Sequence, residues 1–84
     1  MKRRVFWEQS AVEQVAKLAA RNSRPATRIL VATREYGQAN RGDIKKLSGS
    51  DEWRLRVGDW RVVFRLFGDA AYISDVTDRQ DAYP

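Results

Sequence analysis

The stretch 53–65 constrains the fold of this chain more than any other part of the sequence. Two runs of alternating apolar and polar residues flank the pair Gly58-Asp59. Glycine at the first central position of a two-residue loop is typical of a type II′ hairpin turn. We therefore predict two antiparallel strands in a fixed register, with one apolar face that pairs Val57 with Trp60, Leu55 with Val62 and Trp53 with Phe64.

The same register gathers arginines on the other face of the hairpin. It pairs Arg56 with Arg61, Arg54 with Val63 and Glu52 with Arg65. Like charges directly opposite each other destabilise a strand pair. A sheet that retains such a pair is expected to hold an anion, and phosphate matches the geometry of guanidinium groups.

The composition excludes several classes of site. The chain has 84 residues, so we expect one small domain over residues 1–84. It contains neither cysteine nor histidine, which excludes disulfides, thiolate metal sites and the commonest general base. We expect no cofactor and no metal. The net charge of +5 favours an anionic partner such as nucleic acid, although a solvated basic surface fits the charge alone equally well.

No segment of the sequence resembles a membrane anchor or a signal peptide. The apolar runs are much shorter than the ~20 residues of a membrane span. Residues 1–7 are basic at their start but have no apolar stretch behind them. We therefore expect a cytoplasmic protein.

The first part of the chain predicts a short strand and a helix. Residues 3–7 have the composition of a strand, and Ser10 with Glu13 forms the pattern of a capping box at a helix start. The helix should end near Asn22. Its apolar spacing predicts a buried stripe of Ala11, Val12, Val15, Leu18 and Ala19.

A second helix should follow at once. Pro25 suits the first turn of a helix that opens at residues 23–25, and Gly37 is a suitable C-terminal stop. The predicted inner stripe is Ala26, Ile29, Leu30 and Thr33. Residues 38–51 are polar and contain glycines, so we interpret them as a loop.

Three strands of a meander complete the prediction, over residues 52–57, 60–67 and 70–76. The register of the last strand is open. A two-residue loop would place Ile73 on the core face together with Asp75, whereas a three-residue loop with a bulge would place Tyr72 and Val76 there. The expected architecture is α+β, with both helices packed on one sheet face and the arginines on the other.

Three motifs of the sequence together resemble the RelE/ParE superfamily of toxins. They are residues 45–49, with the pattern K-x-L-x-G, the hairpin over 53–64, and the C-terminal stretch 76–83, which carries Arg79 and Tyr83. The resemblance covers essentially the whole chain, because the short strand and the two helices also match the family order. It implies a RelE-like fold.

The resemblance implies one of two activities. RelE-like members cut mRNA in the ribosomal A site as metal-independent endoribonucleases, and ParE-like members inhibit DNA gyrase without nuclease activity. We favour the nuclease. The alternatives are a gyrase inhibitor and a degenerate member that only binds its antitoxin.

Either activity implies a cognate antitoxin and a toxin–antitoxin hetero-oligomer of type II. A small protein with an acidic, partly disordered segment would suit this basic chain. We expect the segment to cover the arginine face or to displace the C-terminal tail.

The resemblance also implies the site, which is Arg54, Arg56, Arg61, Arg79 and Tyr83. RNA cleavage of this type sends the 2′-OH in line to phosphorus and expels the 5′-oxygen, so negative charge builds on the phosphoryl oxygens. We assign Arg56 and Arg61 to the scissile phosphate, with Arg54 beside them. Arg79 would serve the leaving oxygen, and Tyr83 would stack on a base or orient the 2′-OH.

Further cations are candidates for RNA binding. They are Lys45, Lys46 and Arg65. Alternatively, the two lysines are solvated loop charges. The alternative for Arg65 is an exposed ion pair with Glu52.

Two positions depart from the family pattern. Known nucleases have lysine at one or both strand positions before the turn, whereas here both are arginine, which is a poor general base. The base would then be Glu52, Asp59, Asp75 or Asp78, or the reaction would rest on electrostatics alone. Asp78 also replaces a histidine of many relatives, and its carboxylate is expected to weaken Arg79.

Overall fold

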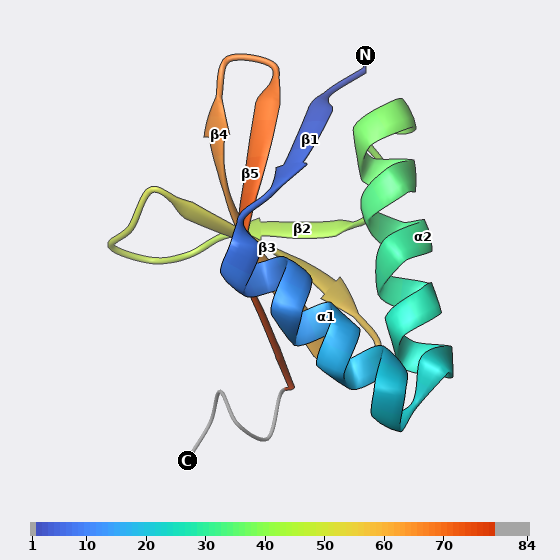
Figure 1. Ribbon diagram of the computed structural model, residues 1–84. Coiled ribbons are helices and arrows are strands. Elements are labelled where there is room, and N and C mark those ends of the chain that lie inside the picture. Colours follow the sequence, from blue (N-terminus) through green and yellow to red (C-terminus); the bar gives the residue numbers. More distant parts are fainter. Residues whose placement is uncertain (1, 79–84) are drawn as a thin grey trace.

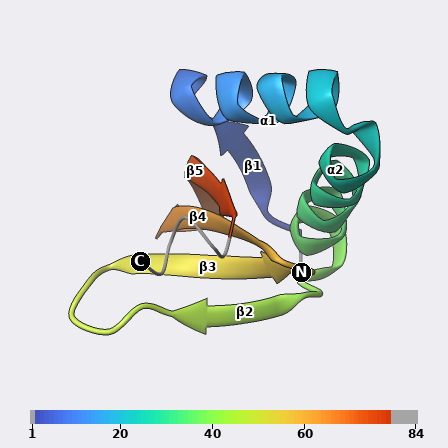
Figure 2. The same cartoon turned by 90° about the horizontal axis from the view of Figure 1, so that it is seen from below.

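A computed structural model of the protein describes residues 2–78. It contains two helices and five strands, which are β1 (Arg4–Trp7), α1 (Gln9–Arg21), α2 (Ser23–Ala39), β2 (Asp43–Lys46), β3 (Glu52–Val57), β4 (Trp60–Phe67) and β5 (Ala70–Asp78). Both helices lie on one side of a single twisted sheet (Figures 1 and 2). The predicted α+β architecture is therefore confirmed. Within the described residues, no helix has the length and apolar content needed to cross a membrane.

The sheet has the strand order β1-β5-β4-β3-β2. The short strand β1 runs parallel to β5, and all other neighbours are antiparallel. The interpretation of residues 38–51 as loop was wrong for Asp43–Lys46, which pair with β3 as strand β2. This strand lies at the sheet edge and carries one apolar residue, Ile44, opposite Leu55. Charged side chains are typical of edge strands, and they obscure the apolar alternation on which the prediction relied.

The start of α1 differs from the predicted capping box. The N-cap is Glu8, which makes no side-chain capping hydrogen bond. The Ser10 hydroxyl instead donates to the backbone oxygen of Ser74 at 3.2 Å, so a contact with β5 replaces the local cap. Of the predicted stripe, Ala11, Val15 and Leu18 are buried, whereas Val12 and Ala19 are exposed.

Helix α2 continues past its predicted end. The Asn22 side chain caps its start by accepting from the Arg24 amide, and the helix ends at Asn40, whose φ of 56° is left-handed. Gly37 is not a stop but a buried contact. A Cβ at Gly37 would lie 2.9 Å from Val5 Cγ2, and the Gly37 carbonyl accepts from the Arg3 amide at 2.6 Å. Glycine therefore lets α2 lie close against β1.

The core fills the space between the helices and the sheet. Its largest fully buried side chains are Phe64, Ile29, Leu55 and Val62. Tyr36 packs on Phe64 with ring centroids 5.1 Å apart, and burial raises the pKa of its phenol. Leu30, predicted to be buried, is 50% exposed because it lies on the outer face of α2.

The register of β5 combines the two predicted alternatives. Phe67 pairs with Ala70 across a two-residue loop, which places Ile73 in the core. The pairing then shifts by one residue, because Phe64 pairs with Ile73 while Val63 pairs with Asp75. This bulge adds one residue to β5, so that Val76 returns to the core in place of Asp75.

Candidate nucleic-acid interface

The hairpin of β3 and β4 has the predicted register at all six positions, including the apolar pairs and the arginine pair. Gly58 has a φ of +61°, whereas Asp59 does not have a positive φ. This combination fits the first and second central positions of a type II′ turn. The tight turn therefore fixes which side chains share a face.

Arg56 and Arg61 are direct partners on the face that the helices leave uncovered. The Arg56 side chain is exposed, and its Nε donates to the Gly58 carbonyl at 3.3 Å. Arg61 is partly buried and pairs on its other side with Thr77 of β5. Two guanidinium groups thus project from neighbouring strands at the turn end of the hairpin.

Arg54 lies in the middle of the same face, between Val63 of β4 and Lys45 of β2. Its side chain is 18% exposed, and Nη1 lies 3.6 Å from Asp43 Oδ1, which is too long for a hydrogen bond. Nη1 is buried without a hydrogen-bond partner in the described part of the chain. A buried donor in this state has capacity for a further acceptor.

The predicted RNA-binding cations are not grouped together. Lys45 lies on the arginine face, whereas Lys46 pairs with Trp53 and therefore lies on the helix-covered side of the sheet edge. Arg65 is on the arginine face but forms ion pairs with Asp51 at 3.5 Å and Glu52 at 3.8 Å. The predicted pair between Arg65 and Glu52 is therefore present.

The candidate carboxylates have different environments. Asp75 Oδ1 accepts from the Gln14 amide at 2.7 Å, and Glu52 faces Arg65. Asp59 is exposed in the hairpin loop. Among residues 2–78, no group of three or more acidic side chains has a geometry that would hold a metal ion.

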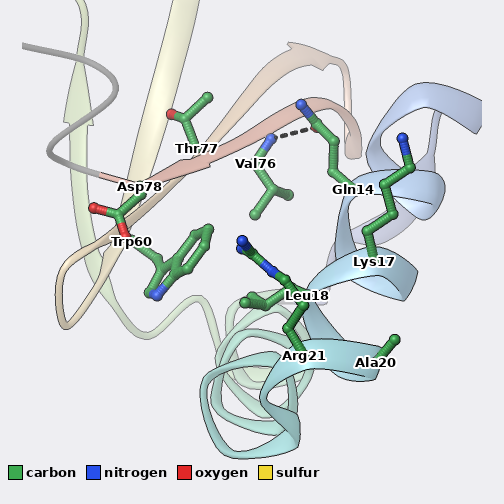
Figure 3. A pocket seen from close by; sticks show the side chains of 9 residues that line it. All are labelled: Gln14, Lys17, Leu18, Ala20, Arg21, Trp60, Val76, Thr77 and Asp78. Carbon is green, nitrogen blue, oxygen red and sulfur yellow. Dashed lines mark hydrogen bonds between the residues drawn. The ribbon is translucent and has the colours of Figure 1, made fainter.

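A groove lies on the helix-covered side of the sheet, where α1 passes the end of β5 (Figure 3). Its volume is about 560 Å³, Lys17 and Arg21 of α1 are among its lining residues, and the Arg21 side chain extends toward Trp60 and Val76. Among residues 2–78, β1 pairs only with residues 70–73 of β5, so no described strand pairs with the rest of that edge, where the groove lies. Gln14 substitutes for one, since its Oε1 accepts from the Val76 amide at 2.8 Å.

Arg79 and Tyr83, the C-terminal candidates, lie outside the described residues. The residues that the structure brings together are therefore Arg54, Arg56, Arg61 and Lys45. Sequence reasoning missed Asp43 of β2, which is the register partner of Arg56 and lies 3.6 Å from Arg54. It also missed Gln14. The helix pattern gives no signal for this residue, because its hydrogen-bond partners, Asp75 and Val76, lie in a distant strand.

Comparisons with known proteins identify the fold. No family model matches the chain, and no curated protein matches it. Among solved structures, the RelB-RelE antitoxin–toxin complex from Methanococcus jannaschii matches with a TM-score of 0.74 and 21% identity, covering 93% of this chain and 94% of that chain. The YoeB/ParE toxin from Agrobacterium tumefaciens matches with a TM-score of 0.74 and 16% identity, covering 89% and 97%. The DinJ-YafQ toxin–antitoxin complex from E. coli matches with a TM-score of 0.74 and 12% identity, covering all of both chains.

The chain thus has the fold of small toxins of toxin–antitoxin pairs. More particularly, it has the RelE-like α+β fold, with two helices on one face of a five-stranded sheet. The resemblance to the RelE/ParE superfamily that the motifs indicated is confirmed at the level of the fold.

Proposed function

We propose that this chain is the toxin of a type II toxin–antitoxin pair and that it cleaves mRNA on the ribosome as a metal-independent endoribonuclease. The observation that carries the proposal is the direct opposition of Arg56 and Arg61 on the uncovered sheet face. Like charges directly opposite each other destabilise a strand pair, and on its other side Arg56 faces Asp43 of β2. A phosphate between the two strands would remove the repulsion.

The chemistry requires stabilisation of charge on the phosphorus substituents. The 2′-oxygen attacks phosphorus, the bond to the 5′-oxygen breaks, and a 2′,3′-cyclic phosphate results. Arg56 and Arg61 donate to the non-bridging oxygens. Arg54 supplies a further donor, because it is the neighbouring β3 residue on the same face. One preorganised donor of this kind contributes roughly 3–4 kcal/mol to transition-state stabilisation.

Proton transfer needs an acceptor for the 2′-OH and a donor for the 5′-oxygen. Asp59 is our candidate acceptor among the four carboxylates, because Glu52 and Asp75 already have partners in Arg65 and Gln14 and Asp78 is not free either. Arg79 is the candidate that stabilises the charge on the leaving 5′-oxygen, which takes its proton from water, and Tyr83 is the candidate that orients the nucleotide. Asp59→Asn preserves a good turn residue, so a loss of cleavage without a loss of stability would support the assignment of Asp59.

The same face would bind the antitoxin. An acidic segment that covers Arg56 and Arg61 would block access of RNA, and the groove with Lys17 and Arg21 offers cations for its continuation. The similar solved structures include complexes of a toxin with its antitoxin. We propose that the free toxin acts in the cytoplasm, where ribosomes are found.

The proposal is tested by controlled expression of the chain and of its Arg61→Ala variant. Translation, mRNA 5′ ends and DNA integrity are followed after induction. We expect cleavage of mRNA within A-site codons for the unaltered chain and its loss in the variant. DNA breaks with intact mRNA would contradict the nuclease and support gyrase as the target, and an absence of toxicity would indicate a protein that only binds its antitoxin.

A further inference from the structure

A second hollow lies on the arginine face, at the far end of β4. Its volume is about 410 Å³, and it is lined by Glu8, Glu52, Arg65, Phe67, Tyr72 and Ser74. Residues 61, 63, 65 and 67 of β4 alternate onto this one face. Phe67 is six residues beyond Arg61, which is about 20 Å along the strand. The hollow is therefore in line with the arginine pair.

Two aromatic rings form walls of this hollow. Phe67 is 61% exposed and Tyr72 is 39% exposed, and their rings meet edge to face with centroids 5.5 Å apart. Phe6 stacks on Tyr72 at 5.2 Å and an interplanar angle of 18°. This third ring fixes the position of Tyr72. Exposed rings next to a cationic face are the side chains on which bases of single-stranded RNA stack.

The charges around the hollow fit a base better than a second phosphate. Arg65 is paired with Asp51 and Glu52, so it is largely neutralised. Glu8 is exposed and makes no capping hydrogen bond with α1. A carboxylate repels phosphate but accepts hydrogen bonds from the N–H groups of bases. Guanine presents two adjacent N–H donors, N1–H and the 2-amino group, which match the two oxygens of one carboxylate.

We propose that the hollow binds a guanine base of the same RNA strand whose phosphate lies between Arg56 and Arg61. The base stacks on Phe67 and meets the Tyr72 ring at its edge, and the Glu8 carboxylate accepts from its N1–H and 2-amino groups. This inference rests on the proposed function, since it adds a base-reading site to that RNA path.

The test uses a 2′-O-methyl oligoribonucleotide, a uridine tract with one guanine, which lacks the attacking 2′-OH and is not cleaved. Affinity for the full chain is measured by fluorescence anisotropy at low salt. The guanine is then replaced by hypoxanthine, which lacks the 2-amino group, or by an abasic residue. We expect the abasic oligonucleotide to bind about fivefold to a hundredfold more weakly, and the hypoxanthine oligonucleotide to fall between the two.

Protein variants separate the two contacts. Phe67→Leu keeps an apolar side chain and should remove most of the difference between guanine and the abasic residue. Glu8→Gln should remove the difference between guanine and hypoxanthine. Leu30→Ala, at an apolar position of α2 that is 50% exposed, should change neither difference.

Equal affinity of the unaltered chain for all three oligonucleotides would overturn the inference, and so would full discrimination in Phe67→Leu. A failure to bind any of them would also overturn it. The nuclease assignment is judged separately, by the loss of mRNA cleavage in Arg61→Ala. Cleavage that depends on Arg61 but is accompanied by no guanine preference would leave the proposed function in place and remove only the base site.

Discussion

Arg56 and Arg61 are direct register partners across the β3–β4 hairpin, so their guanidinium groups leave the sheet on the same face. Like charges directly opposite each other lower the stability of a strand pair, although Asp43 of β2 faces Arg56 on its other side. Because the arginine pair lies next to the tight turn, the same two side chains affect the stability of the hairpin and the function that we propose.

Replacement of one member of this pair should stabilise the protein while it reduces cleavage. We expect Arg56→Thr to raise the free energy of unfolding by about 0.2–1 kcal/mol, because the repulsion with Arg61 is removed and threonine favours strands. Arg65→Thr is the matched control, since Arg65 faces Glu52 and its removal should leave stability equal or slightly lower. Urea denaturation measures both. A loss of stability in Arg56→Thr would contradict the repulsion.

Gly37 should not tolerate a side chain, although alanine favours helices. A methyl group there would meet Val5 Cγ2 at 2.9 Å and the Arg3 carbonyl oxygen at 3.3 Å. We expect Gly37→Ala to lower the free energy of unfolding by about 1–2 kcal/mol, because overpacking outweighs the gain of ~1 kcal/mol in helix propensity. Combination with Val5→Ala should reduce the loss caused by Gly37→Ala. Two independent, additive effects would show that the contact is not responsible.

Gln14 should contribute to stability through its two hydrogen bonds to β5, directly after the bulge. Its side chain accepts from the Val76 amide and donates to Asp75, so it completes hydrogen bonds that no strand provides there. We expect Gln14→Ala to lower the free energy of unfolding by about 1–3 kcal/mol, because a backbone amide loses its acceptor. Lys17→Ala, on the next turn of α1, serves as the control. Amide hydrogen exchange at Val76 should accelerate only in the Gln14 variant; unchanged exchange there would argue against this role.

The pair of Arg4 and Asp69 should give the protein a small acid-dependent stability. The hydrogen bond from Arg4, at 3.0 Å, holds the pKa of the Asp69 carboxyl below its ordinary value. The stabilisation is therefore present above the unfolded-state pKa and is lost as the pH falls through the lower folded-state pKa. We expect the thermal stability of Asp69→Asn to be below that of the unaltered chain at pH 6 and equal to it at about pH 2. A constant difference across this range would disagree with the assignment.

The sequence predicted the elements whose pattern is local. The type II′ turn at Gly58-Asp59 determines the pairing of β3 with β4 within a few residues, so all six pairs followed from the alternation. The fold class followed from the order of strand, two helices and strands. The same hairpin register also places Arg56 and Arg61 on one face.

The errors concern contacts between residues that are distant along the chain. Ser10 was assigned to a helix cap but donates to Ser74, and Gly37 was assigned to a helix end but packs against Val5. The bulge at Ser74 contacts α1, since Ser10 donates to the Ser74 carbonyl and Gln14 to the Asp75 carboxylate. The sequence pattern does not predict strand β2, because Ile44 is its single apolar residue and shows no alternation. Only the pairing of Ile44 with Leu55 identifies the segment as a strand.

The most direct test of the central claim is a double-mutant cycle on RNA cleavage with Arg56→Ala and Arg61→Ala. Single-turnover cleavage is measured on ribosomes programmed with a defined mRNA, using variants whose folding is verified by circular dichroism. If both arginines hold one phosphate, each single variant should lose about 100-fold to 1,000-fold in rate, and the double variant should lose much less than the product of the two. Full cleavage activity in either single variant would contradict the claim that the pair holds the scissile phosphate.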